Sequence, residues 1–181
     1  MLEGSSPRIV RLTAWPVSRH GRGGFTVLEI IVVVVILAIA AAMVVPMISS
    51  GETTKVLAAA QRVAADLEYA KSMAITSGCY YRVAFDTAAG SYQLEGQNGA
   101  VIAHPVNAGT NYVVSFNGGQ LDGVQIVSAN FDGTHEVRFD GLGSPYNGSG
   151  NHLTSGVITL QGGALTQTIR VEPVTGVITI Q

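Results

Sequence analysis

An apolar run at residues 25–45 constrains this chain more than any other feature. Its sequence, FTVLEIIVVVVILAIAAAMVV, contains two polar side chains, Thr26 and Glu29. At about 1.5 Å per residue, a helix of this length spans roughly 30 Å, the thickness of the hydrocarbon core of a bilayer. A single helix can satisfy all its backbone hydrogen bonds there without neighbours. The run therefore predicts a transmembrane segment at 25–45.

The residues before this run have a different character. Residues 1–24 hold four of the chain's ten basic residues and one of its twelve acidic residues, so this stretch is +3 and residues 25–181 are −5. Basic residues flanking a membrane segment favour the cytoplasmic side. The stretch is also rich in proline and glycine and lacks periodicity. We predict a disordered cytoplasmic leader at 1–24, which is excluded from the fold.

A second helical pattern follows Pro46. Apolar residues recur at steps of three and four, which is the spacing of one helix face: Val56, Ala60, Val63, Leu67, Ala70 and Ala74. Pro46 removes one backbone hydrogen bond and should kink or loosen the helix rather than end it. Gly78 can terminate the helix. We therefore predict one long N-terminal helix, residues 25–77, whose second half docks on a folded domain.

After Gly78 the apolar period changes to two, which is typical of strands. Short strands are expected near 80–85, 91–95, 100–103, 111–116, 123–128, 135–140, 156–161, 165–172 and 176–181. Glycine pairs and Pro173 separate them. The predicted fold class is α+β, with the long helix covering one edge or face of an antiparallel, sandwich-like β domain at 79–181. Cys79 is the only cysteine, so no intramolecular disulfide can form, and we expect it to be a small, partly buried core residue.

The junction between leader and apolar run holds two chemical signals. Gly23 and Gly24 give a flexible, accessible backbone of the kind that a protease needs. Glu29 places a carboxylate inside an apolar run, where an unpaired charge costs about 2.5–3.5 kcal/mol at the centre of a bilayer and less near its edge. Glu29 should therefore have a partner. The natural one is a new α-amine at Phe25, created by cleavage, on the same or a neighbouring subunit.

Residues 24–29, Gly-Phe-Thr-Val-Leu-Glu, resemble the cleavage site of type IV prepilins and type II secretion pseudopilins. The resemblance covers residues 22–77. It implies that a prepilin peptidase cuts after Gly24 and methylates the new N-terminus at Phe25. It further implies that Glu29 sets the assembly register with an adjacent subunit, and that Pro46 marks a kink where the helix can melt.

Two C-terminal stretches point to a subgroup. Residues 135–145 and 168–180, the latter with a Pro173-Val174-Thr175-Gly176 turn, resemble minor pseudopilin H and minor pilins of the FimT and FimU kind. Two strands joined by a tight turn are also common in proteins of many kinds, so this pattern can be purely structural. The predicted function is a minor pseudopilin, a structural subunit of the periplasmic pseudopilus of type II secretion. The alternative is a minor type IV pilin in pilus biogenesis or DNA uptake.

The resemblance also implies a location and partners. The chain would be a single-pass protein of the bacterial inner membrane with its C-terminal domain in the periplasm. Its expected partners are other pseudopilins or pilins in a filament, the prepilin peptidase, the inner-membrane assembly platform and the lipid bilayer. Nucleic acid is not expected, because residues 25–181 are acidic and the chain ends without a basic tail.

The sequence contains no motif that indicates an enzyme. The four histidines, at positions 20, 104, 135 and 152, lack metal-ligand spacing, and no phosphate-binding loop or nucleophile motif is present. We expect no catalytic activity, no cofactor and no metal. An alternative is a calcium site formed by Asp122, Asp132, Glu136 and Asp140, since oxygen-rich loops suit that ion. These acids more often solvate turns and strand faces.

Overall fold

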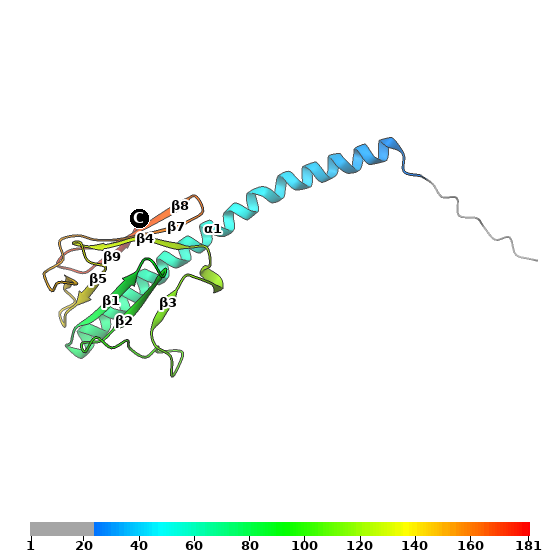
Figure 1. Cartoon of the computed structure of the whole chain (residues 1–181). Helices are drawn as coiled ribbons and strands as arrows, with labels where there is room; N and C mark the ends of the chain where they lie inside the picture. Colours follow the sequence, from blue (N-terminus) through cyan, green and yellow to red (C-terminus); the bar gives the residue numbers. More distant parts are fainter. Residues whose placement is uncertain (1–23) are drawn as a thin grey trace, which may run out of the picture. The chain divides into compact units, whose positions relative to one another are not determined.

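The computed structural model describes residues 24–181, except for the side chains of residues 42–50. The chain divides into two compact units, Met1–Ala41 and Ala42–Gln181. Helix α1, Val27–Ser77, begins in the first unit and ends in the second; Figure 1 draws it as a coiled ribbon coloured from blue to green. The backbone is helical on both sides of Pro46, and the kink expected there stays a prediction.

The end of α1 follows from local chemistry. Gly78 adopts φ +66, the left-handed conformation that glycine reaches without a Cβ penalty and that commonly stops a helix. The hydroxyl of Ser77 donates to the carbonyl of Met73 at 2.7 Å, which satisfies one of the carbonyls left free in the last turn. Cys79 follows as a free, half-buried residue, in agreement with its expected role.

The second unit holds two antiparallel sheets. The five-stranded sheet has the order β3-β2-β1-β5-β6 and consists of β1 (Tyr81–Asp86), β2 (Ser91–Glu95), β3 (Val113–Ser115), β5 (Glu136–Phe139) and β6 (Pro145–Asn147). The four-stranded sheet has the order β4-β7-β8-β9 and consists of β4 (Gln125–Phe131), β7 (Gly156–Gly162), β8 (Leu165–Val171) and β9 (Ile178–Ile180). A short 3-10 helix, η1 (Gly119–Leu121), precedes β4. The α+β class predicted from the change of period is confirmed.

Two strand predictions were wrong. The strand expected at 100–103 is absent, because Val101 bridges back to Glu95 while Ala103 bridges to Asn111, so no single partner strand accompanies the segment. Strand β6 was not expected, because it opens with Pro145 and lacks apolar alternation. It forms because β5 offers a free edge, where Phe139 pairs with Pro145.

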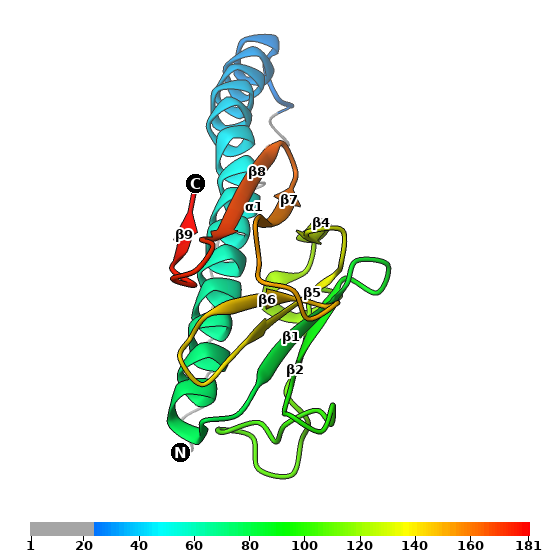
Figure 2. The same ribbon diagram turned by 90° about the vertical axis from the view of Figure 1, so that its left-hand side faces the viewer.

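A single core joins the helix to both sheets. The stripe predicted on the helix is fully buried, and every one of its six members is 0% exposed. Phe85 of β1 stacks on Phe131 of β4 at 5.8 Å between ring centroids, which brings the two sheets together. We expected the helix to cover one edge or face. The helix in fact contacts both sheets. Asp66 accepts a hydrogen bond from Tyr92 of β2, and Val56 lies beside Gly162 at the end of β7. Figure 2 shows the helix running alongside β7.

Candidate functional site: the processing junction and the docked helix

Gly24 is the first described residue, and it lies exposed before the helix begins. A Cβ built at Gly24 meets no described atom within 4 Å, so there is open space beside this residue in that direction. Phe25 follows with 79% of its surface exposed. The bond expected to be cut is thus accessible and non-helical, as a protease requires. Residues 1–23 of the leader lie outside the described residues.

Thr26 caps the start of α1. Its hydroxyl accepts a hydrogen bond from the backbone N–H of Glu29 at 3.2 Å, and its carbonyl accepts the first helical bond from Ile30 at 3.2 Å. Thr26 is therefore the N-cap and Glu29 is the third helical residue, which is the spacing of a capping box. Sequence reasoning missed this role of Thr26, although Thr-x-x-Glu before an apolar run is its signal.

The cap at Thr26 places Glu29, and with it the carboxylate, in the first turn of α1. It occupies the first turn, where the positive end of the helix dipole favours an anion. Within residues 24–41 and 51–181, no cationic side chain comes within 4 Å of it. The carboxylate is therefore placed in the first turn by the backbone, without an ion pair among the described residues.

The first turns of α1 are apolar on all sides. The large apolar side chains of residues 27–39 are 48–76% exposed, with no polar face among them after Glu29. A helix that is hydrophobic all round is stable only when something else covers it, either lipid or other helices. Within the described residues of the first unit, nothing covers this surface.

No helical stretch among the described residues meets both the length and the hydropathy needed to cross a bilayer.

The second half of α1 is tied to the five-stranded sheet by one buried carboxylate. Asp66, 4% exposed, accepts hydrogen bonds from the hydroxyls of Tyr92 at 2.6 Å and Tyr112 at 2.9 Å. It also forms an ion pair with Arg62, one helical turn earlier, at 3.0 Å. A buried charge is tolerated only when it is paired and hydrogen-bonded, and Asp66 meets both conditions. The network fixes the helix against the sheet that follows it in the chain.

The same network perturbs its two tyrosines. Burial raises the pKa of Tyr112 to about 12, and the hydrogen bond and negative charge of Asp66 act in the same direction. Burial and the charge of Asp66 also raise the pKa of Tyr92 well above its ordinary value of 10.0. Both shifts have the same causes, because a tyrosinate would be poorly solvated there, would lose its hydrogen bond and would be repelled by the Asp66 carboxylate.

The raised pKa values predict a loss of stability at alkaline pH. A group whose pKa is raised by folding stabilises the protein fully below its unfolded pKa and ceases to do so as the pH passes its folded pKa. The contribution of Tyr112 should therefore be constant below pH 10 and vanish by about pH 12. Urea unfolding of residues 50–181 between pH 8 and 12 measures this. Tyr112→Phe should show a smaller decline above pH 10, and an unchanged decline would exclude the tyrosine as its source.

Other polar groups in the second unit have structural roles. The Asp132 carboxylate accepts from the backbone N–H groups of Thr154 and Ser155, and that of Asp140 accepts from those of Leu142 and Ser144. Asp122 accepts from the N–H of Gly118, and Glu136 pairs with Arg82. In the part of the chain that the structure describes, no three His, Cys, Asp or Glu side chains gather as metal ligands. The four acids considered for calcium thus serve separate turns and strands.

Comparisons with known proteins bear on the chain as a whole. The family model described as "Type II transport protein GspH" matches residues 59–175, and the model of a prokaryotic N-terminal methylation motif matches residues 19–45. No curated protein matches the chain at a significant level.

Three solved structures resemble the chain at low identity. The minor pseudopilin EpsH from the type 2 secretion system of Vibrio cholerae is 12% identical over 70% of this chain and 96% of its own, with a TM-score of 0.48. The type IV minor pilin FimU of Pseudomonas aeruginosa is 13% identical over 72% of this chain and 90% of its own, with a TM-score of 0.47. A second crystal form of FimU is 13% identical over 69% of this chain and 91% of its own, with a TM-score of 0.44.

The two family models cover complementary parts of the chain. The methylation motif spans the processing junction and the apolar run, while the other model spans most of the docked helix and strands β1 to β8. The latter covers well over half of the chain. The chain therefore belongs to the GspH family of type II transport proteins.

Proposed function

We propose that this protein is a minor pseudopilin that builds part of the periplasmic pseudopilus of a type II secretion system. The observation that carries this proposal is the capped, uncovered apolar helix that directly follows an accessible Gly24–Phe25 bond within a methylation motif. Such a helix needs lipid before assembly and neighbouring helices after it. A filament subunit drawn from a membrane meets both needs in turn.

The proposed topology is a single pass through the inner membrane. The leader, residues 1–24, stays in the cytoplasm, because its +3 charge opposes transfer across the membrane. Residues 25–45 span the bilayer, and the β domain, residues 79–181, lies in the periplasm. The prepilin peptidase cuts after Gly24 and methylates Phe25, and the assembly platform then moves the subunit into the filament.

Glu29 acts in assembly through its place in the first helical turn. After cleavage, the new N-terminus of one subunit is a cation at the end of an apolar helix, and Glu29 of another is an anion three helical positions in. In an apolar surrounding, each is costly alone and strongly attracted to the other. The pair therefore specifies how far one helix slides past the next.

Gly24→Ala is expected to block processing almost completely. The added Cβ meets no atom within 4 Å, so the fold is unaffected and the change acts at the cleavage site alone. The measurement is the mass of the chain isolated from its host membranes, which should retain all 24 leader residues. Gly51→Ala is the matched control, since its Cβ also meets nothing. A normally processed Gly24→Ala chain would place the cut elsewhere.

Glu29→Ala is expected to leave cleavage intact and reduce incorporation into filaments by about tenfold or more, the effect of losing one well-placed charge pair. Sheared filaments are compared with the membrane fraction by immunoblot. Glu52→Ala removes an exposed acid further along the same helix and should assemble normally. If Glu29→Ala and Glu52→Ala behave alike, Glu29 does not set the register.

A deletion strain distinguishes secretion from pilus assembly. Loss of exported enzymes from the culture medium, with surface pili and DNA uptake unchanged, is the expected result. Loss of pili or of transformation with normal secretion would assign the subunit to a type IV pilus instead.

A further inference from the structure

A hollow of about 810 Å³ lies beside β3, the edge strand of the five-stranded sheet. Helix α1 contributes Arg62 and Asp66 to its walls, and the loop at residues 104–111 contributes His104 and several of its neighbours. The backbone N–H of His104 donates to the carbonyl of Thr110 at 2.9 Å. This bond closes the base of the loop and leaves the tip, residues 105–109, to be held in another way.

The ring of His104 anchors the tip. Its Nδ1 accepts hydrogen bonds from the backbone N–H groups of Val106, at 3.1 Å, and Asn107, at 3.2 Å. In the described part of the second unit, the other hydrogen bonds of the tip run from Thr110 to the carbonyl of Asn107 and lie within the loop. One nitrogen atom of one side chain therefore ties the tip to the base of its loop.

Both of these hydrogen bonds require a neutral imidazole. A neutral ring has one N–H donor and one acceptor nitrogen, whereas both nitrogens of a protonated ring are donors. Protonation of His104 would replace the accepting lone pair of Nδ1 with an N–H that faces two other N–H groups. Histidine is the side chain whose charge ordinarily changes between about pH 5 and 8. The anchor of the tip is therefore sensitive to pH.

The surroundings of the ring do not share this sensitivity. His104 stacks on Tyr112 with 4.6 Å between ring centroids, and a cation over an aromatic face is attracted to it. Burial raises the pKa of Tyr112 to about 12, and Tyr69 of α1 stacks on it at 5.7 Å. Arg62 and Asp66, which line the same hollow, form an ion pair with each other at 3.0 Å. Protonation should therefore break the bonds at Nδ1 and leave the ring on Tyr112.

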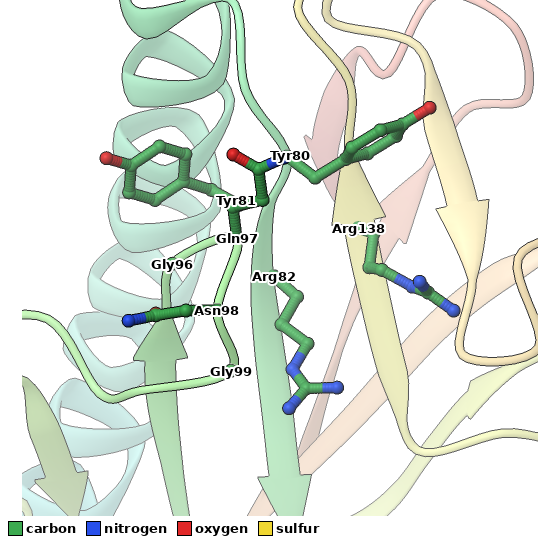
Figure 3. Close-up of a pocket in the computed structure, with 8 residues that line it drawn as sticks. All are labelled: Tyr80, Tyr81, Arg82, Gly96, Gln97, Asn98, Gly99 and Arg138. Carbon is green, nitrogen blue, oxygen red and sulfur yellow. The ribbon is translucent and has the colours of Figure 1, made fainter.

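The cleft drawn in Figure 3 lacks such a group. It has a volume of about 320 Å³ and is lined by eight residues, none of which is a histidine. Its Arg82 forms ion pairs with Glu95 and Glu136, and an arginine is not deprotonated in proteins. Of these two hollows, the one beside β3 is the one that a histidine lines.

We propose that His104 is a pH-sensitive latch, whose protonation releases the loop tip, residues 105–109, while the ring stays on Tyr112. The release moves part of the wall of the hollow, including Val106, which is 83% exposed. The inference goes beyond the proposed function and rests on it for one point. A periplasmic domain meets the pH of the medium, because the porins of the outer membrane are water-filled channels.

NMR relaxation of residues 50–181 measures the release directly. Every buried residue of the hydrophobic core belongs to this unit, so it folds without the apolar start of α1. The order parameters of the Val106 and Asn107 amides should be about 0.85 at pH 8 and below about 0.6 at pH 4.5. The midpoint should coincide with the titration of the His104 ring protons. Order parameters that stay high at pH 4.5 overturn the latch, and so does a midpoint that differs from that of the ring.

Two substitutions of His104 separate the acceptor from the charge. His104→Asn supplies a neutral acceptor, and asparagine commonly bonds to the backbone two residues on, so the tip should stay ordered at both pH values. His104→Phe keeps an aromatic ring without an acceptor, so the tip should be mobile at both. The matched control is His152→Phe, because His152 also stacks on a tyrosine, Tyr146, at 4.4 Å. It should leave the transition unchanged. A pH transition that persists in His104→Phe overturns the proposal.

These outcomes are separate from those that test processing and assembly. Thermal unfolding of each variant at pH 8 shows that the domain is folded, so mobility at residues 105–109 is local. A tip that ignores the charge of His104 overturns the latch and leaves the proposed function intact. A normally processed Gly24→Ala chain affects the proposed function and leaves the latch intact.

Discussion

Asp66→Ala is expected to lower the free energy of unfolding of the β domain by about 3 kcal/mol, the sum of two hydrogen bonds to a charged acceptor at about 1.5 kcal/mol each. The change removes the acceptor of both tyrosine hydroxyls, at 2.6 and 2.9 Å. Tyr92 is 1% exposed, so water cannot replace the lost carboxylate. Its hydroxyl would remain buried without a partner, which costs more than the lost bond itself.

Urea unfolding of residues 50–181 at pH 7 measures this loss. Glu68→Ala is the matched control, because Glu68 lies on the same helix half a turn away, is exposed, and pairs only at the surface with Lys71. Exposed pairs of this kind contribute about 0–1 kcal/mol. Should the two variants prove equally stable, the buried network would not be what holds the helix to the five-stranded sheet.

Gly162→Ala is expected to destabilise the same domain by about 1–3 kcal/mol, the usual cost of overpacking a core. Gly162 ends β7 where helix α1 crosses the four-stranded sheet. A Cβ at this position would lie 2.3 Å from a methyl carbon of Val56. Val56 is fully buried, so it has no room to move aside. The helix or the β7–β8 turn would have to shift instead.

A rescue experiment separates this clash from a general effect of the substitution. Adding Val56→Ala to Gly162→Ala removes the methyl groups that the new Cβ meets, so the double variant should be more stable than the sum of the single changes predicts. Gly51→Ala, in the exposed part of the helix, should raise stability by about 0.5–1 kcal/mol, because alanine is the better helix former. Additive losses at positions 56 and 162 would show that the two residues do not meet in solution.

Both predictions concern contacts that the sequence pattern does not reveal. The stripe beginning at Val56 shows from its spacing alone that one helix face is buried, and the structure confirms every member of it. Its spacing carries no information on which strands lie against that face. Asp66 lies beside the stripe, at a position that the spacing predicts to be on the surface. It is buried because Tyr92 of β2 and Tyr112, just before β3, donate hydrogen bonds to it there.

The errors in the strand predictions have a related cause. Residues 100–103 have strand-like composition, but a strand exists only where a partner accompanies it for several residues, and Val101 and Ala103 bridge to different segments. Strand β6 shows the reverse, since Pro145 argues against a strand while the free edge of β5 supplies the pairing. Partner availability is a non-local property, so local alternation cannot determine it.

The sequence by itself determined everything that depends on neighbours along the chain. These features are the apolar run, the helix that ends at Gly78 and the hairpin that follows. Only the tertiary structure decided that the helix serves both sheets through Asp66 and Val56, and that Glu95 and Glu136 both pair with Arg82. The reason is physical: helix period and capping are set within a few residues, whereas burial of a charge and compensation between charges depend on which distant strands come together.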